Sequence, residues 1–208
     1  MVEFFFSCND TATPKTRDVV LELLSEEKKG RVLDAGAGPG ILSRMLSEAG
    51  FQVAACDINP GGFQVEGVKC DKADLNQKLP YGDESFDHAA LIETIEHLEN
   101  PWNTLREINR IVKKGGAIIV TTPNLLHIVY RVAFLLTGET PGFSYGDYKN
   151  NRHITPIPLW NLERMLSEAG FKIEKVTFNQ GYVQKIRLGL PWKNILLGQT
   201  LIVKARKN

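Results

Sequence analysis

The stretch Val32–Gly40, with the sequence VLDAGAGPG, constrains the fold more than any other part of the chain. It lies between a short apolar run, Arg31–Ala35, and a segment with helically spaced apolar residues, 41–49. The pattern predicts a strand, a sharp bend and a helix that begins near Pro39 and presents free backbone N–H groups to a ligand. Glycines let the backbone approach that ligand where a Cβ would collide, and they stand at Gly36, Gly38 and Gly40.

Similar apolar runs recur along the chain and predict further strands at Phe51–Cys56, Gly67–Cys70, Phe86–Ile92, Ala117–Thr121, Phe171–Phe178 and Gln199–Lys204. Helical spacing predicts helices at Thr16–Leu24, Ile41–Ala49, Trp102–Val112 and Leu159–Ala169. Because strands and helices alternate, we expect parallel strands joined by right-handed crossovers. The last two strands lack a full crossover helix between them. The sequence therefore predicts a three-layer α/β sandwich with a mostly parallel seven-stranded sheet that ends in an antiparallel hairpin.

The length of 208 residues fits a single domain, 1–208. The regular alternation breaks between residues 123 and 156, and we interpret this segment as an insertion, a name kept below. It contains the apolar stretch Leu125–Leu136 and several glycines and aromatic residues. A lid over a partly apolar substrate is one interpretation. A piece of the core or the face of a homodimer are the alternatives.

Charge and cysteine content narrow the partners and the compartment. The net charge of +1 gives no broad basic surface, so a small-molecule substrate is expected and nucleic acid is not. The three cysteines, Cys8, Cys56 and Cys70, form no CxxC pair, which favours a reducing, cytoplasmic location. The stretch Leu125–Leu136 is too short to span a bilayer and includes His127 and Arg131, so no integral membrane association is expected.

The residues around the bend indicate the class of ligand. A dinucleotide-binding G-x-G-x-x-G motif needs a third glycine where this chain has Ile41. Asp34 stands directly before the glycines, and its carboxylate would repel a pyrophosphate but attract an ammonium or a sulfonium. A ligand with positive groups is therefore favoured over a nicotinamide dinucleotide.

Several segments, in order and across nearly the whole chain, resemble class I S-adenosylmethionine-dependent methyltransferases. They are VLDAGAGPG at 32–40, Asp57 about 20 residues beyond the glycine bend, Ala73-Asp74-Leu75, FDHAALIETIEHL at 86–98 and REINRIVKKGGAIIVTTPN at 106–124. The nearest resemblance is to type 11 and ubiquinone-biosynthesis O-methyltransferases. It implies a Rossmann-like fold that ends in a reversed hairpin and implies S-adenosylmethionine as the cofactor.

The resemblance also implies which residues bind the cofactor. Asp57 would hold both ribose hydroxyls and Asp74 would lie beside the adenine. The full set is Asp34, Gly36, Ala37, Gly38, Gly40, Asp57, Ile58, Asp74, Leu75, Leu91 and Glu93. Purely structural interpretations remain open: the glycines form a tight turn, Asp57 caps the Asn-Pro-Gly-Gly turn that follows it, and Asp74 forms a turn.

The acceptor side is less defined. His153, at the end of the insertion, is the candidate catalytic base or acceptor-orienting residue; the alternative is a histidine that fastens the insertion to the sheet. Glu93, Glu96 and His97 form an ExxEH cluster that resembles one in ubiquinone-biosynthesis O-methyltransferases and small-RNA 2′-O-methyltransferases, where it implies a divalent metal. We assign no metal ligand, because Glu96 and His97 could instead cap or pair with the helix at Pro101.

The expected function is methyl transfer from S-adenosylmethionine to a small, partly apolar acceptor, with an oxygen favoured as the methylated atom. Such a transfer depends mainly on alignment of the two reactants and exclusion of water. Two alternatives stay open: a non-catalytic S-adenosylmethionine-binding subunit that contacts a partner, and an RNA 2′-O-methyltransferase.

Overall fold

The structure, a computed structural model, describes residues 14–179 and 195–208; Cys8 lies outside these ranges. Its centre is one sheet with the strand order β3-β2-β1-β4-β5-β7-β6. The strands are β1 (Arg31–Ala35), β2 (Gln52–Asp57), β3 (Cys70–Lys72), β4 (Phe86–Leu91), β5 (Val112–Pro123), β6 (Phe171–Phe178) and β7 (Thr200–Lys207). The predicted seven-stranded sheet is confirmed.

Strand directions also agree with the prediction. The pairs β1–β2, β1–β4, β2–β3 and β4–β5 are parallel. β7 is antiparallel to both of its neighbours and lies between β5 and β6. Because the parallel strands β1, β2 and β4 end at the same edge of the sheet, the bend after β1 and the residues after β2 and β4 meet there.

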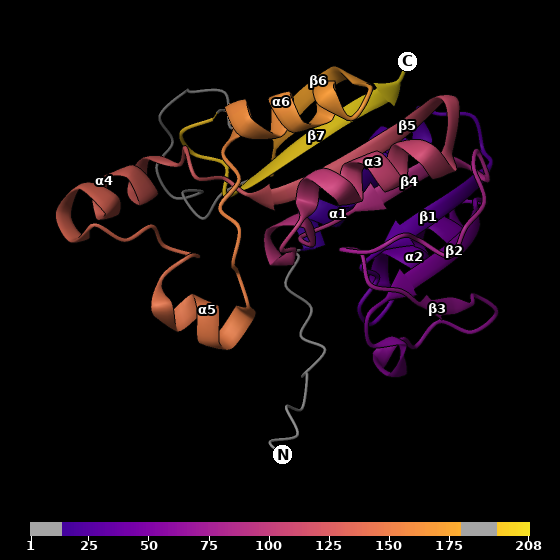
Figure 1. Cartoon of the computed structure of the whole chain (residues 1–208), viewed down its shortest axis with the longest axis horizontal. Helices are drawn as coiled ribbons and strands as arrows, with labels where there is room; N and C mark the ends of the chain where they lie inside the picture. The colour runs from indigo at the N-terminus through magenta and orange to yellow at the C-terminus, as the bar shows by residue number, and fades with distance from the viewer. Residues whose placement is uncertain (1–13, 180–194) are drawn as a thin grey trace.

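Helices cover both faces of the sheet. α3 (Pro101–Ile111) and α6 (Leu159–Glu168) lie over the face turned to the viewer in Figure 1, and α1 (Pro14–Ser25) and α2 (Ile41–Glu48) cover the other. Neighbouring strand residues point to opposite faces. One core therefore contains Leu33, Ala89, Ile118 and Val203, and the other contains Val32, Ala90, Ile119 and Ile202.

Several predicted boundaries differ from the structure at glycines. The third strand begins at Cys70 rather than Gly67, because Gly67 has a φ of 75° and belongs to a turn. α2 begins at Ile41 rather than near Pro39, because Gly40 is left-handed with a φ of 88°. β5 is longer at both ends than the predicted Ala117–Thr121.

The expected alternation of strands and helices is wrong on one side of the sheet. β2 and β3 are separated only by the short 3-10 helix η1 (Pro60–Gly62), and residues 73–85 join β3 to β4 without a helix. This connection begins with a turn around Asp74 and also contains Pro80 and Gly82, which do not favour helix.

The insertion contains two helices, α4 (Ile128–Thr137) and α5 (Tyr145–Asn151), which Figure 1 shows away from the main body. The sequence patterns predicted no helix where α5 lies. A reciprocal capping box between Ser144 and Asp147 starts α5 and explains why so polar a segment is helical. Among the described residues, no helix has the length and apolar character needed to cross a membrane.

Two adjacent glycines of β5, at the register shift between β4 and β5, allow a test of the sheet. A Cβ on Gly116 would overlap the backbone oxygen of Asp87 on β4, whereas Gly115 faces open space with a φ of 76°. We expect Gly116→Ala to lower the free energy of unfolding by about 3 kcal/mol through overpacking, and Gly115→Ala by about 1 kcal/mol through backbone strain. Urea denaturation measures both; equal losses would contradict the contact.

Candidate functional site

Backbone hydrogen bonds fix the glycine bend against the end of β2. The amides of Gly36 and Ala37 both donate to the carbonyl of Cys56, at 2.8 and 3.1 Å. The amide of Gly38 donates to Oδ2 of Asp57 at 2.9 Å. The bend therefore holds its position by contacts with the neighbouring strand, and the amino end of α2 follows directly after it.

Gly36 also joins the bend to the segment after β4. It has a φ of 79°, and a Cβ at this position would lie 2.5 Å from Cγ2 of Thr94. A larger residue would combine backbone strain with a clash. Thr94 directly precedes the 3-10 helix η2 (Ile95–His97), so this contact sets the distance between the bend and η2.

The two downstream aspartates form turns. Oδ1 of Asp57 accepts from the amide of Asn59 at 2.9 Å, and Oδ1 of Asp74 accepts from the amide and the Nδ2 of Asn76. These contacts agree with the turn-forming interpretations. They leave further lone pairs on each carboxylate, so a second role toward a ribose or an adenine stays a prediction.

Asp34 is buried beneath the bend. Its Oδ2 accepts a hydrogen bond of 2.6 Å from Oγ of Ser43 on α2. Burial raises the pKa of Asp34 to about 6, although the Ser43 bond and the positive charge of Arg17 act in the opposite direction. A positive ligand group would therefore favour the charged form of this carboxyl.

Glu93 follows β4 in a left-handed conformation with a φ of 48°. Its amide donates a hydrogen bond to Oγ1 of Thr121 at 2.9 Å, and the Thr121 hydroxyl in turn donates to Oε1 of Glu93 at 2.8 Å.

The other predicted cofactor residues differ in exposure. Leu75 and Leu91 are buried, whereas the side chain of Ile58 is 56% exposed.

The structure brings Glu96, His97 and His153 together. One potential ligand atom from each lies within 4.8 Å of the others, and the two imidazole rings meet edge-on with centroids 4.8 Å apart. Glu96 is fully buried, and neither of its carboxylate oxygens makes a hydrogen bond of ordinary geometry among the described residues, although the hydroxyl of Thr122 lies close enough to lower its pKa. Nε2 of His153 is likewise buried without a partner.

The interpretation of Glu96 and His97 as caps of the helix at Pro101 is wrong. α3 is capped by Asn100, whose side chain accepts from the amide of Asn103. Burial, followed by the nearby charge of Glu93, raises the pKa of Glu96 well above its ordinary value. Burial lowers the pKa of His97, so its neutral form is favoured.

Sequence reasoning missed four residues that support the site. Ser43 and Thr94 hold Asp34 and the bend, and Thr121 holds Glu93. Arg17, on α1, is buried close enough to Asp34 and Glu93 for their charges to affect its pKa. Thr94 and Thr121 lie within quoted motifs and could have been considered, as could Ser43 shortly after the glycine bend. Nothing local to Arg17 indicates that α1 reaches this edge.

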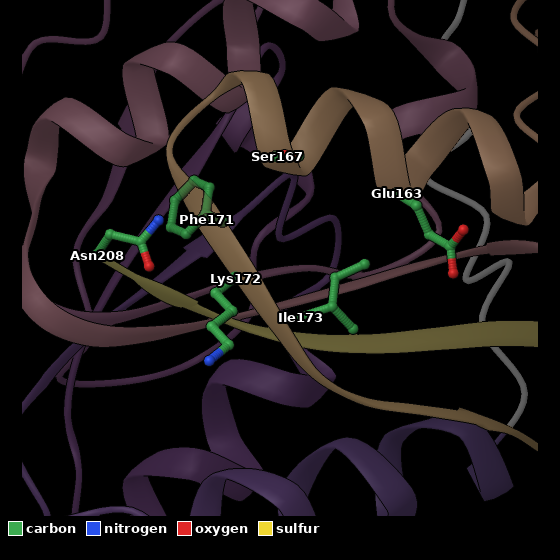
Figure 2. A pocket seen from close by; sticks show the side chains of 6 residues that line it. All are labelled: Glu163, Ser167, Phe171, Lys172, Ile173 and Asn208. Atoms are coloured by element: carbon green, nitrogen blue, oxygen red, sulfur yellow. The ribbon is translucent and has the colours of Figure 1, made fainter.

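A separate hollow lies between α6 and β6 (Figure 2), lined by Glu163, Ser167, Phe171, Lys172, Ile173 and Asn208. Phe171 pairs with Lys207 at the start of β6, level with the amino end of the paired part of β5. The hollow is therefore at the opposite edge of the sheet from the glycine bend and is not part of the candidate site.

The strand order, the reversed β7 and a glycine bend flanked by carboxylates define a Rossmann-like α/β domain with a cofactor site at the ends of β1, β2 and β4. The chain belongs to a family of methyltransferases: the family profile described as "Methyltransferase domain" matches residues 11–176. This family and the fold imply S-adenosylmethionine as the cofactor.

Individual relatives agree with this assignment. A malonyl-[acyl-carrier protein] O-methyltransferase from Pseudescherichia vulneris is 33% identical over 113 residues, which are 52% of this chain and 45% of the relative. A ubiquinone biosynthesis O-methyltransferase from Ruegeria pomeroyi is 28% identical over 151 residues, 68% of this chain and 60% of the relative. The matched regions span 44–60% of the first curated relatives' own length.

Solved structures agree on the fold. A methyltransferase from Thermotoga maritima, described as a possible histamine N-methyltransferase, superposes with a TM-score of 0.69 and 21% identity. The superposition covers 93% of this chain and 88% of that one. At this identity the similarity shows the fold alone.

Asp57 provides a test of how the bend is held. Asp57→Ala removes the acceptor for the amides of Gly38 and Asn59, so we expect the free energy of unfolding to fall by about 1–2 kcal/mol and the Gly38 amide to exchange faster. Asp74→Ala is the matched control, because its hydrogen bonds stay within one turn. Urea denaturation and hydrogen exchange measure the effects; unchanged exchange at Gly38 would contradict the bridge.

Proposed function

We propose that the protein transfers the methyl group of S-adenosylmethionine to an oxygen of a small acceptor bound at the end of β4. When bound, the cofactor supplies an electrophilic methyl group on a positively charged sulfur. Asp34 and the glycine bend would hold its amino acid end and Asp57 its ribose; Asp74, Leu75 and Ile58 would surround the adenine. Glu93 and Leu91 would border the cofactor from β4. This assignment is supported by the position of these residues at one edge of the sheet, where β1, β2 and β4 end.

The proposed position of the acceptor rests on buried polar atoms of Glu96 and His153 that make no hydrogen bond among the described residues. A buried carboxylate and a buried imidazole nitrogen without partners are unfavourable, and such atoms commonly serve a ligand. Glu96 lies close along the chain to Thr94, which approaches the cofactor bend at Gly36, and His153 packs against the neighbouring His97. His153 or Glu96 can accept the proton of a hydroxyl as the methyl group is transferred. The relatives named O-methyltransferases add support for oxygen.

The same cluster fits a divalent ion. Glu96 offers a carboxylate and the two histidines offer imidazole nitrogens, a donor set that suits Mn²⁺, Fe²⁺, Co²⁺ or Zn²⁺ better than Mg²⁺. The resemblance of the ExxEH cluster points the same way, with His153 in place of a ligand contributed by Glu93, whose carboxyl accepts from Thr121. Bound there, an ion would polarise an acceptor hydroxyl as a Lewis acid.

The test is turnover with small hydroxylated acceptors, measured as S-adenosylhomocysteine release, beside matched amines and transfer RNA. We expect release with hydroxyl acceptors, less after EDTA treatment and more after Mn²⁺ or Zn²⁺ is added back. Glu96→Gln and His153→Gln should lower kcat about 100-fold with little change in the KM for S-adenosylmethionine. Glu99→Gln, an exposed acid on the same segment, should have no effect.

Other outcomes of this assay would overturn the proposal in distinguishable ways. Release only with RNA would support the RNA 2′-O-methyltransferase alternative. Binding of S-adenosylmethionine without release on any acceptor would support a non-catalytic subunit. Release with amines alone would contradict oxygen as the methylated atom.

The raised pKa of Asp34 predicts a pH dependence of cofactor binding. With a pKa of about 6, Asp34 is mostly neutral at pH 5 and mostly ionised at pH 7. Only the ionised form attracts the ligand ammonium, so we expect S-adenosylhomocysteine to bind about tenfold more tightly at pH 7 than at pH 5. Calorimetry at both pH values measures this change. Asp34→Asn should bind more weakly and lose most of the difference; an unchanged pH dependence in this variant would contradict the assignment.

A further inference from the structure

The part of the insertion around α5 is held to the rest of the protein mainly at its ends. No residue of α5 is buried, and the helix is stabilised locally by the capping box of Ser144 and Asp147. After α5 the chain returns to η2, where the amides of Ile154 and Thr155 both donate to the carbonyl of Glu96 at 3.0 Å. The position of α5 therefore depends on what happens at η2.

The two histidines of the cluster connect both ends of this segment. Nδ1 of His153 lies 2.6 Å from the carbonyl oxygen of Gly142, before α5, and Nδ1 of His97 lies 3.2 Å from that of Arg152, after it. The ring of Phe143 also packs against His153, with centroids 5.3 Å apart. Residues 142–153 thus form a loop whose two ends meet at these imidazoles, and we call it the α5 loop.

These hydrogen bonds fix which nitrogen of each ring is free. A carbonyl oxygen can only accept, so Nδ1 of both His97 and His153 must carry the proton. In a neutral ring Nε2 then has a lone pair and acts as an acceptor or a metal ligand. Together with the buried carboxyl of Glu96, the two rings place three potential ligand atoms within 4.8 Å of one another.

We propose that a divalent transition-metal ion bound by Glu96, His97 and His153 fastens the α5 loop to η2, so that occupancy of this site determines whether the loop closes over the acceptor end of β4. This inference rests on the metal site of the proposed function and adds a structural role to it. Glu96 and His97 belong to η2 and His153 ends the α5 loop, so the ion joins the two. The positive charge of the ion stabilises the ionised form of the buried Glu96 carboxyl.

The physical consequence is a linkage between ion binding and the order of the loop. Without an ion, Glu96 is a buried carboxyl without a partner, so the closed arrangement is held only by backbone hydrogen bonds and the ring contacts. An ion that binds the closed form better than the open one stabilises it in proportion to RT ln(1 + [ion]/Kd). The strands of the sheet contribute no ligand to the ion, so ion binding should not change their stability.

The test is hydrogen exchange of the full chain after EDTA treatment, with and without Mn²⁺ or Zn²⁺. We expect amides in 142–153 to exchange at least about tenfold more slowly with the ion, while those of β1 and β4 keep their rates. His153→Gln should remove the ion effect, and Glu99→Gln should retain it. Calorimetry with each metal and with S-adenosylhomocysteine runs in parallel. Because the wild-type protein is itself compared with and without the ion, the test does not depend on the folding of His153→Gln.

Each result has one meaning. Ion-dependent protection confined to the α5 loop and lost in His153→Gln supports the proposal. Ion binding by calorimetry without a change in exchange overturns the fastening role and leaves the metal site intact. No binding of either metal overturns both, whereas S-adenosylhomocysteine binding and turnover on a hydroxyl acceptor would still uphold methyl transfer. Protection that spreads equally to β1 and β4 would indicate general stabilisation and also overturn the proposal.

Discussion

The hydrogen bonds between the glycine bend and the end of β2 are the constraint on which the site depends. Because the carbonyl of Cys56 accepts from two consecutive amides of the bend, the path of the chain there is set by the backbone and not by a side-chain rotamer. The amino end of α2 is thereby placed over the edge of the sheet. The close approach of Gly36 to Thr94 then fixes η2, and with it the acceptor side, relative to the cofactor side.

The electrostatics of the two sides differ in a way that suits their ligands. On the cofactor side, Asp34 and Glu93 share the buried Arg17, and both still have raised pKa values because burial dominates. A cofactor with its own positive charge would favour ionised carboxyls there. On the acceptor side, the buried carboxyl of Glu96 lies beside two imidazoles whose Nδ1 atoms face backbone carbonyls. A bound cation would stabilise the ionised form of this carboxyl, which is the physical reason to expect one there.

Local patterns predicted the sheet well and its connections less well. Six of the seven strands follow from short apolar runs, whereas the predicted strand Gly67–Cys70 meets β3 only at Cys70. Errors of a few residues arose where a glycine such as Gly67 or Gly40 adopts a left-handed conformation. The expectation that a helix follows every strand failed at β2 and β3, because it was extended from the regular alternation seen elsewhere in the chain. α5 was missed because its residues are mostly polar, although Ser144 and Asp147 stand at the capping-box spacing and could have indicated a helix start.

The cofactor side could be predicted from the sequence more fully than the acceptor side, for a related reason. The predicted cofactor residues occur in contiguous motifs at the ends of strands, so their meeting follows from the topology of a parallel sheet. The acceptor cluster joins Glu96 and His97 to His153, and this approach depends on the amides of Ile154 and Thr155 pairing with a carbonyl of η2. Backbone pairing of this kind leaves no pattern in side-chain type. A chain of this fold can therefore keep one cofactor bend and change its acceptor through the length and path of the insertion, which is why the family assignment alone does not identify the acceptor.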